Sequence, residues 1–174
     1  MTAIAPPPAD EYGPAMAAYI GRIRDDEAIF PVLETQLDEV LTRLRTVPES
    51  RGGHRYAPGK WSVKELVGHL SDAERIFAYR ALRFARGDAS PLAAFDENAY
   101  VPAMEADART LADCIAEWAD VRRATLALFR HLPAEAWARR GPASGKVTSV
   151  RALAYIIAGH VRHHLEVLGA RYGV

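Results

Sequence analysis

The chain has 174 residues, within the roughly 100–200 residues of a single domain, and 49% of them are hydrophobic, enough for one sizeable core. Lysine plus arginine balance aspartate plus glutamate at 22 each. The overall charge therefore lacks the basic excess that attracts nucleic acid or an anionic membrane. Cys114 is the only cysteine, which excludes an internal disulfide and a cysteine-rich metal cluster and is typical of a reducing compartment.

The N-terminal stretch MTAIAPPPADEYG lacks the basic start and the apolar run of a signal peptide. No other stretch approaches the ~20 apolar residues of a membrane span. We therefore expect a cytoplasmic chain that binds neither membranes nor nucleic acid. Residues 1–12 are rich in proline and alanine and are expected to form a flexible lead-in, which leaves residues 13–174 as a single domain.

Apolar residues recur at steps of three and four through most of the chain, a spacing that indicates amphipathic helices. The first helix is expected over about residues 26–46, with Pro31 in its first turn, where no backbone donor is needed. A second is expected over about 63–86. Ser62 and Glu65 form the S-x-x-E capping box that marks its start.

A third helix is expected near residues 109–131, after a polar connector over 87–108. This connector has about 20 residues, more than the usual two to eight between neighbouring helices of a bundle, and such connectors are often functional or cross the bundle. The fourth helix is capped by Thr148 or Ser149 and ends at Gly169. We find no convincing strand pattern, so the expected fold is all-α, a four-helix bundle.

Three of the six histidines fall in the stretch GHVRHHLEVLG, on the fourth helix. At 100° per residue, His164 lies inside the apolar stripe of this helix, His160 lies at its edge, and His163 points away from it. His160 and His164 therefore form an i, i+4 pair, close enough for both imidazoles to reach one metal ion. The alternative is a pair of core histidines that only make hydrogen bonds.

His69 lies on the apolar stripe of the second helix, so a third imidazole faces the core. A neutral imidazole has one donor and one acceptor, and a charged one is costly in an apolar interior. A divalent ion bound by His69, His160 and His164 resolves this conflict and leaves a coordination position for water or substrate, as in catalytic sites. Zinc or nickel is the expected ion, and iron and copper also suit three imidazoles.

Three further polar residues have two interpretations each. Asp72, one turn after His69, either orients an imidazole or adds an oxygen ligand, or is an ordinary exposed carboxylate. Arg80 lies about 16 Å along the helix axis from His69, and we expect it to pair with an interior carboxylate or to extend to solvent. His163 is expected to be solvated, with proton transfer at the rim of the site as the alternative. No catalytic residue is assigned.

The segments WSVKELVGHLSDAERIFAYR, FDENAY and AGHVRHHLEVL resemble the DinB superfamily and, within it, the YfiT-like branch of metal-dependent hydrolases and thiol-dependent transferases. The similarity covers about residues 25–170 and rests on the spacing from Trp61 to His69, the aspartate three residues later, and the terminal H-x-x-x-H-H. It implies a four-helix bundle with up-down-down-up connectivity. It also implies a divalent metal held by His69, His160 and His164.

The resemblance further implies an activity, because several members of the superfamily use mycothiol, bacillithiol or glutathione as co-substrates in transferase or isomerase reactions. Our preferred hypothesis is a metal-dependent enzyme that transfers a low-molecular-weight thiol to an electrophilic small molecule, or rearranges such a molecule. The alternatives are a hydrolase that uses a metal-bound water and a non-catalytic metal-binding stress or interaction protein. Family members often pair through bundle faces, so a homodimer is also expected.

Two features bear on how far the resemblance extends. YfiT-like sequences often carry a second histidine just before the first ligand, where this chain has Gly68. Asp96 and Glu97, in FDENAY, match an acidic pair that recurs in the family connector. On a long loop these two residues either line the site or cap a short helix.

Overall fold

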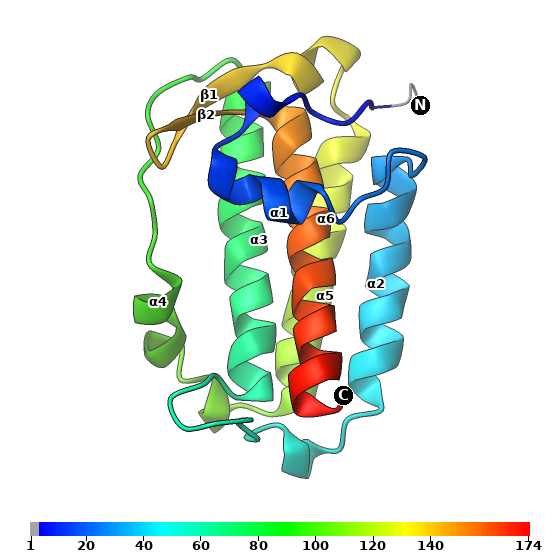
Figure 1. Cartoon of the computed structure of the whole chain (residues 1–174), viewed down its shortest axis with the longest axis vertical. Coiled ribbons are helices and arrows are strands. Elements are labelled where there is room, and N and C mark those ends of the chain that lie inside the picture. The colour runs from blue at the N-terminus through cyan, green and yellow to red at the C-terminus, as the bar shows by residue number, and fades with distance from the viewer. Residues whose placement is uncertain (1–3) are drawn as a thin grey trace.

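Four long helices dominate the computed structural model, which describes residues 4–174 (Figure 1). They confirm the four helices expected from the sequence, with ends that differ by a few residues. Two short α-helices, five short 3-10 helices and a C-terminal π-helical turn, Leu168–Tyr172, complete the helical structure of residues 4–174. Within residues 4–174, no helix is long and apolar enough to cross a membrane. The helices are α1 (Ala17–Ile20), α2 (Ile29–Arg45), α3 (Val63–Ala85), α4 (Glu97–Ala103), α5 (Leu111–Arg130) and α6 (Val150–Val167).

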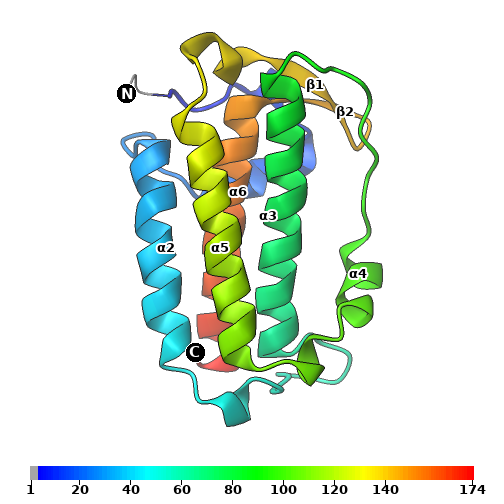
Figure 2. The same cartoon turned by 180° about the vertical axis from the view of Figure 1, so that it is seen from behind.

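The connectivity is up-down-down-up, as the resemblance implied. In Figures 1 and 2, α2 and α6 run in one direction while α3 and α5 run in the other. After α3 the connector returns along the outside of the bundle, past α4, to the end where α3 began. The connector is long because it spans the whole bundle. In cross-section α2 and α3 each contact both α5 and α6.

Side-chain caps fix the starts of three long helices. The capping box of α3 is present: the Ser62 hydroxyl accepts a hydrogen bond from the backbone N–H of Glu65 (3.1 Å), and the Glu65 carboxylate accepts one from Ser62 N–H (2.7 Å). At α5 the Thr110 hydroxyl accepts a hydrogen bond from the backbone N–H of Asp113 at 3.0 Å, without the reciprocal bond of a capping box. Of the two candidate caps for α6, the structure uses Ser149, whose hydroxyl accepts from Ala152 N–H at 3.0 Å.

A two-stranded antiparallel hairpin precedes α6, where the sequence pattern showed no strand. Its strands are β1 (Arg140–Ala143) and β2 (Lys146–Ser149). Strands of four residues are too short to show a clear alternation of apolar and polar side chains. The turn between them consists of Ser144 and Gly145, which both have positive φ (53° and 73°), as a tight hairpin turn requires.

The N-terminal segment packs against the hairpin and α6. Residues 4–12, the described part of the expected lead-in, place the fully buried Glu11 beside β2 and α6, whereas residues 1–3 lie outside the described part of the chain. The Glu11 carboxylate accepts hydrogen bonds from Ser149 (2.7 Å), Arg140 (2.6 Å) and Arg151. The hydrogen bond from Arg151 is the main reason why the pKa of Glu11 is below its ordinary value.

The buried hydrophobic residues form two clusters, one toward the hairpin end of the bundle and one toward the other end. Along α2, α3 and α5, a buried polar side chain lies between the residues of the two clusters. These side chains are Gln36, Glu74 and Arg122. A polar layer therefore crosses the middle of the core.

One hydrogen-bond network in this layer joins all four long helices. Arg122, which is 0% exposed, donates from Nε and Nη2 to the two carboxylate oxygens of Glu74, at 2.7 and 2.9 Å. Its Nη1 donates to the side-chain oxygen of Gln36 (3.0 Å) and to the backbone oxygen of Leu33 (3.1 Å). Gln36 in turn donates to the backbone oxygen of Ala158 on α6, at 2.8 Å. Such bidentate, charge-assisted pairs are geometrically specific.

Glu74→Gln should lower the free energy of unfolding by about 3–5 kcal/mol, because it leaves the Arg122 guanidinium buried without an anion. Urea unfolding followed by circular dichroism measures the change. Glu34→Gln is the matched control, since Glu34 pairs with Arg130 (2.8 Å) on the exposed surface. The control should cost at most about 1 kcal/mol. Equal, small losses in both variants would contradict the role assigned to the buried pair.

Candidate metal centre

Three histidines meet between α3 and α6. The Nε2 atoms of His69 and His160 are 3.0 Å apart, and those of His160 and His164 are 3.1 Å apart. Each residue is more than nine-tenths buried, and each offers a ring nitrogen within 4.8 Å of the other two. The structure thus brings together the three residues that the sequence placed on the inward faces of two helices.

Aromatic rings surround this cluster. The Trp61 ring centre lies 4.7 Å from that of His69. On the other side, the ring centres of Tyr19 and Phe77 lie 5.3 and 6.0 Å from that of His160. The histidine nitrogens therefore face one another inside a largely apolar enclosure, where electrostatic interactions are stronger than in water.

The donor set fits a divalent metal better than it fits internal hydrogen bonding. A neutral imidazole nitrogen carries either one hydrogen or one lone pair. The single Nε2 of His160 is within hydrogen-bond distance of two other Nε2 atoms, so it cannot make two good hydrogen bonds. Three lone pairs directed at one cation remove the conflict, and imidazole nitrogen is a preferred ligand of zinc, nickel, iron and copper.

Burial keeps the three imidazoles neutral near pH 7. It lowers the pKa of His69 to about 4 and that of His164 to about 3. The pKa of His160 lies well below its ordinary value, mainly through burial and further through the neighbouring imidazoles. Neutral imidazole is the form that binds metal, so no proton has to be displaced at neutral pH.

His163 lies at the rim of the site, where it is only partly solvated. It is half-buried, its Nδ1 lies 3.3 Å from Nη2 of Arg22, and its ring centre lies 5.6 Å from that of Tyr19. The sequence could not show this, because Arg22 and Tyr19 come from the N-terminal segment that folds over α6. Burial, with a further effect of the Arg22 charge, lowers the pKa of His163.

Asp72 does not join the histidine cluster. Its carboxylate pairs with Arg75 at 3.5 Å, and within the described residues it makes no hydrogen bond to the three imidazoles. Burial raises the pKa of Asp72 above its ordinary value. Of the two interpretations of this residue, the structure favours the one without a contact to the ligands.

Asp96 and Glu97, the acidic pair of the connector, differ in their contacts. Asp96 caps α4, since its side chain accepts a hydrogen bond from the backbone N–H of Asn98 at 2.9 Å. Glu97 follows in the first turn of α4. Its negative charge partly opposes the lowering of the pKa of His69 by burial, and adds to burial in raising the pKa of Tyr19. The capping interpretation is therefore confirmed for Asp96.

A glycine directly precedes a candidate ligand on each of the two helices, a signal that the sequence reasoning did not use. A Cβ atom on Gly68 would lie 2.4 Å from the sulfur of Met104, so the glycine lets the connector pack on α3 beside His69. A Cβ atom on Gly159 would lie 1.9 Å from the backbone oxygen of Tyr19. Gly159 therefore lets the N-terminal segment contact α6 next to the histidines.

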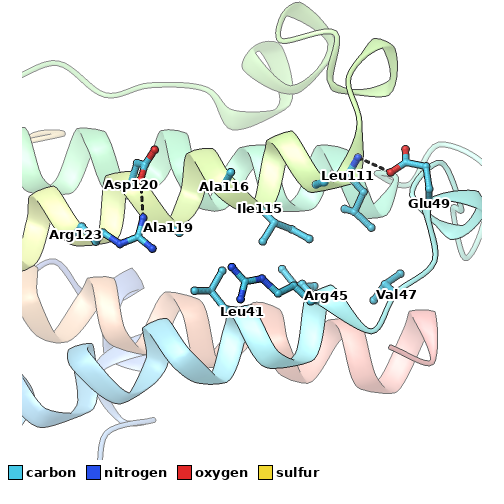
Figure 3. Close-up of a pocket in the computed structure, with 12 residues that line it drawn as sticks. Leu41, Arg45, Val47, Glu49, Leu111, Ile115, Ala116, Ala119, Asp120 and Arg123 are labelled. Carbon is cyan, nitrogen blue, oxygen red and sulfur yellow. Dashed lines mark hydrogen bonds and ion pairs between the residues drawn. The ribbon is translucent and has the colours of Figure 1, made fainter.

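A separate pocket of about 470 Å³ lies between α2 and α5 (Figure 3). No histidine lines it, and Leu41 contributes part of its apolar wall. Three of its four charged groups are already paired within the chain: Arg123 donates to Asp120 at 2.6 Å, and Glu49 accepts from the backbone N–H of Leu111 at 2.8 Å. The fourth, Arg45, forms no ion pair within residues 4–174. The histidine cluster, not this pocket, carries the distinctive chemistry of the molecule.

The geometry defines a class of protein: a four-helix bundle with a buried three-histidine cluster suited to a divalent metal. The chain belongs to the DinB superfamily, whose family description matches residues 33–168. No curated protein matches it.

Two solved structures are similar to the chain. YfiT from Bacillus subtilis, a probable metal-dependent hydrolase with an unusual four-helix bundle topology, has a TM-score of 0.72 and 18% identity, over 96% of this chain and 93% of that one. The mycothiol-dependent maleylpyruvate isomerase has a TM-score of 0.60 and 16% identity, over 79% of this chain and 58% of that one. At these identities the likeness shows the fold.

Gly159→Ala should destabilise the protein by about 1–3 kcal/mol, because the added methyl group forces the Tyr19 backbone away from α6. Hydrogen exchange should also become faster in residues 17–23. Gly53→Ala is the control, since a Cβ atom there meets nothing within 4 Å. Unfolding in urea and exchange by mass spectrometry give the two readouts. If both variants behave alike, the close contact at Gly159 does not hold the segment in place.

Proposed function

We propose that the chain binds a divalent metal ion through His69, His160 and His164 and is an enzyme that transfers a low-molecular-weight thiol to an electrophilic small molecule or rearranges such a molecule. The observation that carries the proposal is the convergence of three neutral, buried imidazoles. Membership of the DinB superfamily supports it. Zinc or nickel is the preferred ion, and iron and copper remain compatible with the ligand set.

When bound, the ion lowers the pKa of a thiol or water and polarises a carbonyl group. A thiol with a pKa of about 8.5 needs a shift of only one to two units to ionise at pH 7, whereas water at about 15.7 needs nearly nine. Within residues 4–174 no carboxylate is hydrogen-bonded to the three imidazoles. This balance favours a thiol as the nucleophile.

The aromatic wall has a complementary role in the proposal. Trp61, Phe77 and Tyr19 exclude bulk water from the cluster, which protects a reactive thiolate and strengthens its attraction to positive charge. Because all three ligands are uncharged, they do not reduce the positive charge available to an anionic nucleophile. The chain's own residues thus bind, orient and desolvate the reactants.

Hydrolysis is the second candidate function. It is favoured by the likeness to YfiT over 96% of this chain, since that protein is described as a probable metal-dependent hydrolase. Hydrolysis and thiol transfer can use the same three ligands, so the two candidates differ in the nucleophile rather than in the ligand set.

A turnover panel tests the proposal. Metal-free protein and protein loaded with zinc, nickel, iron or copper are assayed with 1-chloro-2,4-dinitrobenzene and an epoxide, each with mycothiol, bacillithiol or glutathione. We expect thiol-dependent turnover only with metal. It should fall by at least about a hundredfold in His164→Ala, as for the loss of a metal ligand, and stay unchanged in His131→Ala, an exposed histidine at the end of α5.

The same panel includes p-nitrophenyl esters without thiol. Metal-dependent ester cleavage with no thiol reaction would support the hydrolase candidate instead. No turnover with any loaded metal, thiol or ester would contradict both enzymatic candidates.

A further inference from the structure

The core contains two buried arginines in different electrostatic situations. Arg122 is fully paired with Glu74. Arg80, on α3, is also more than nine-tenths buried, yet within residues 4–174 it forms no ion pair with a carboxylate. Of the two alternatives expected from the sequence, pairing with an interior carboxylate was therefore wrong, and extension to solvent applies to part of the guanidinium. A buried, unpaired guanidinium is costly, so this arrangement calls for an anionic partner from outside the chain.

Only part of the Arg80 guanidinium is used by the protein. Its Nη2 donates to the backbone oxygen of Ala93 in the connector (2.8 Å) and to the hydroxyl of Ser144 in the hairpin turn (3.0 Å). Nε and Nη1 make no hydrogen bond within the described chain. They are also absent from the fully enclosed polar atoms without a partner, so they reach solvent. The protein thus uses Nη2 and leaves the N–H groups of Nε and Nη1, which lie on different edges of the guanidinium, free to donate.

The Arg80 guanidinium lies near the histidine cluster, on the other side of Phe77. The guanidinium carbon is 5.9 Å from the ring centres of both Phe77 and Phe95. The Phe77 ring centre is in turn 6.0 Å from that of His160. A single aromatic ring therefore separates the cation from a candidate metal ligand.

Burial is the cause that lowers the pKa of Arg80, and no nearby acid opposes this effect. An arginine nevertheless stays charged at neutral pH. Phe77 and Phe95 provide apolar surface beside the Arg80 guanidinium, and the free N–H groups of Arg80 provide positively charged hydrogen-bond donors. A carboxylate suits this arrangement, because a carboxylate oxygen can accept a charge-assisted hydrogen bond from a free N–H of Nε or Nη1.

We propose that Arg80 binds a carboxylate group of a reactant at the histidine site, with Phe77 and Phe95 flanking the bound group. The inference rests on the proposed function, which places the reacting atoms at the histidines. It adds a substrate class: either the electrophile or the thiol co-substrate carries a carboxylate located one aromatic ring away from the reacting centre. Arg80 then acts as a specificity-determining residue.

Binding can be tested without turnover. The Nε–H resonance of Arg80 is followed by nuclear magnetic resonance in protein with ¹⁵N-labelled arginine, metal-free and metal-loaded, during titration with benzoate and with neutral benzyl alcohol. We expect a saturable shift with benzoate and none with benzyl alcohol. The Arg80→Gln variant should bind benzoate about tenfold more weakly, as for loss of a charged hydrogen bond.

Arg83→Gln is the matched control, because Arg83 lies on the same helix but pairs with Asp88. It should bind benzoate as the unaltered protein does, and Arg80→Lys should keep part of the affinity because it keeps the charge. Circular dichroism confirms that each variant is folded. An Arg80 resonance that benzoate leaves unchanged, or equal benzoate affinity in Arg80→Gln, would overturn the proposal.

Kinetic arms identify which reactant carries the carboxylate. One arm compares 4-(bromomethyl)benzoate with its methyl ester, and the other compares glutathione with its diethyl ester. Arg80→Gln should raise KM about tenfold for the acid in one arm and leave the ester unchanged, with kcat little affected. If neither acid is affected, the proposal fails while the proposed function stands. If benzoate binding depends on Arg80 but no turnover occurs, the anion site stands and the proposed function fails.

Discussion

The buried ion pair between Arg122 and Glu74 is the constraint on which the rest of the bundle depends. A charge left unpaired in a protein interior costs several kcal/mol, so α3 and α5 cannot slide past each other without breaking the pair. Gln36 extends the constraint from α2 to the backbone of α6 at Ala158, two residues before His160. Residues outside the histidine cluster thereby fix the positions of α3 and α6 relative to each other along the bundle axis.

The histidine cluster lies between the two helices, α3 and α6, that this network holds in place. The two helices that supply the imidazoles are closely covered on their outer sides, because Gly68 and Gly159 admit the connector and the N-terminal segment directly beside the candidate ligands. The result is a small, aromatic-walled site with neutral nitrogens at its centre. Arg80 adds a positive charge near its edge, with the ring of Phe77 between the guanidinium and His160.

Local sequence signals accounted for the helices and for the meeting of the histidines. Apolar spacing located four long helices, the capping box at Ser62 fixed the start of α3, and the 100° rotation per residue turned His69, His160 and His164 inward. These features depend on residues close together in the chain. The order of the helices in space came from the family resemblance, since periodicity carries no information about connectivity.

The features that the sequence did not reveal depend on contacts between distant segments. Glu11 lies in a proline-rich stretch, and its partners Ser149 and Arg151 follow more than a hundred residues later. The four-residue hairpin strands are stabilised by pairing rather than by their own pattern. The environment of Arg80 likewise arises where the connector and the hairpin turn meet α3. Such contacts can be read only once the chain is folded.

The most direct test of the central claim is the metal content per chain, by elemental analysis after gentle purification and after reloading with zinc, nickel, iron or copper. The account predicts about one ion per chain, as for a single site with three protein ligands, lost in His69→Ala, His160→Ala and His164→Ala but retained in His163→Ala. A protein that takes up none of these ions, or that keeps its metal in every variant, would show that the three histidines are core residues and not a metal centre.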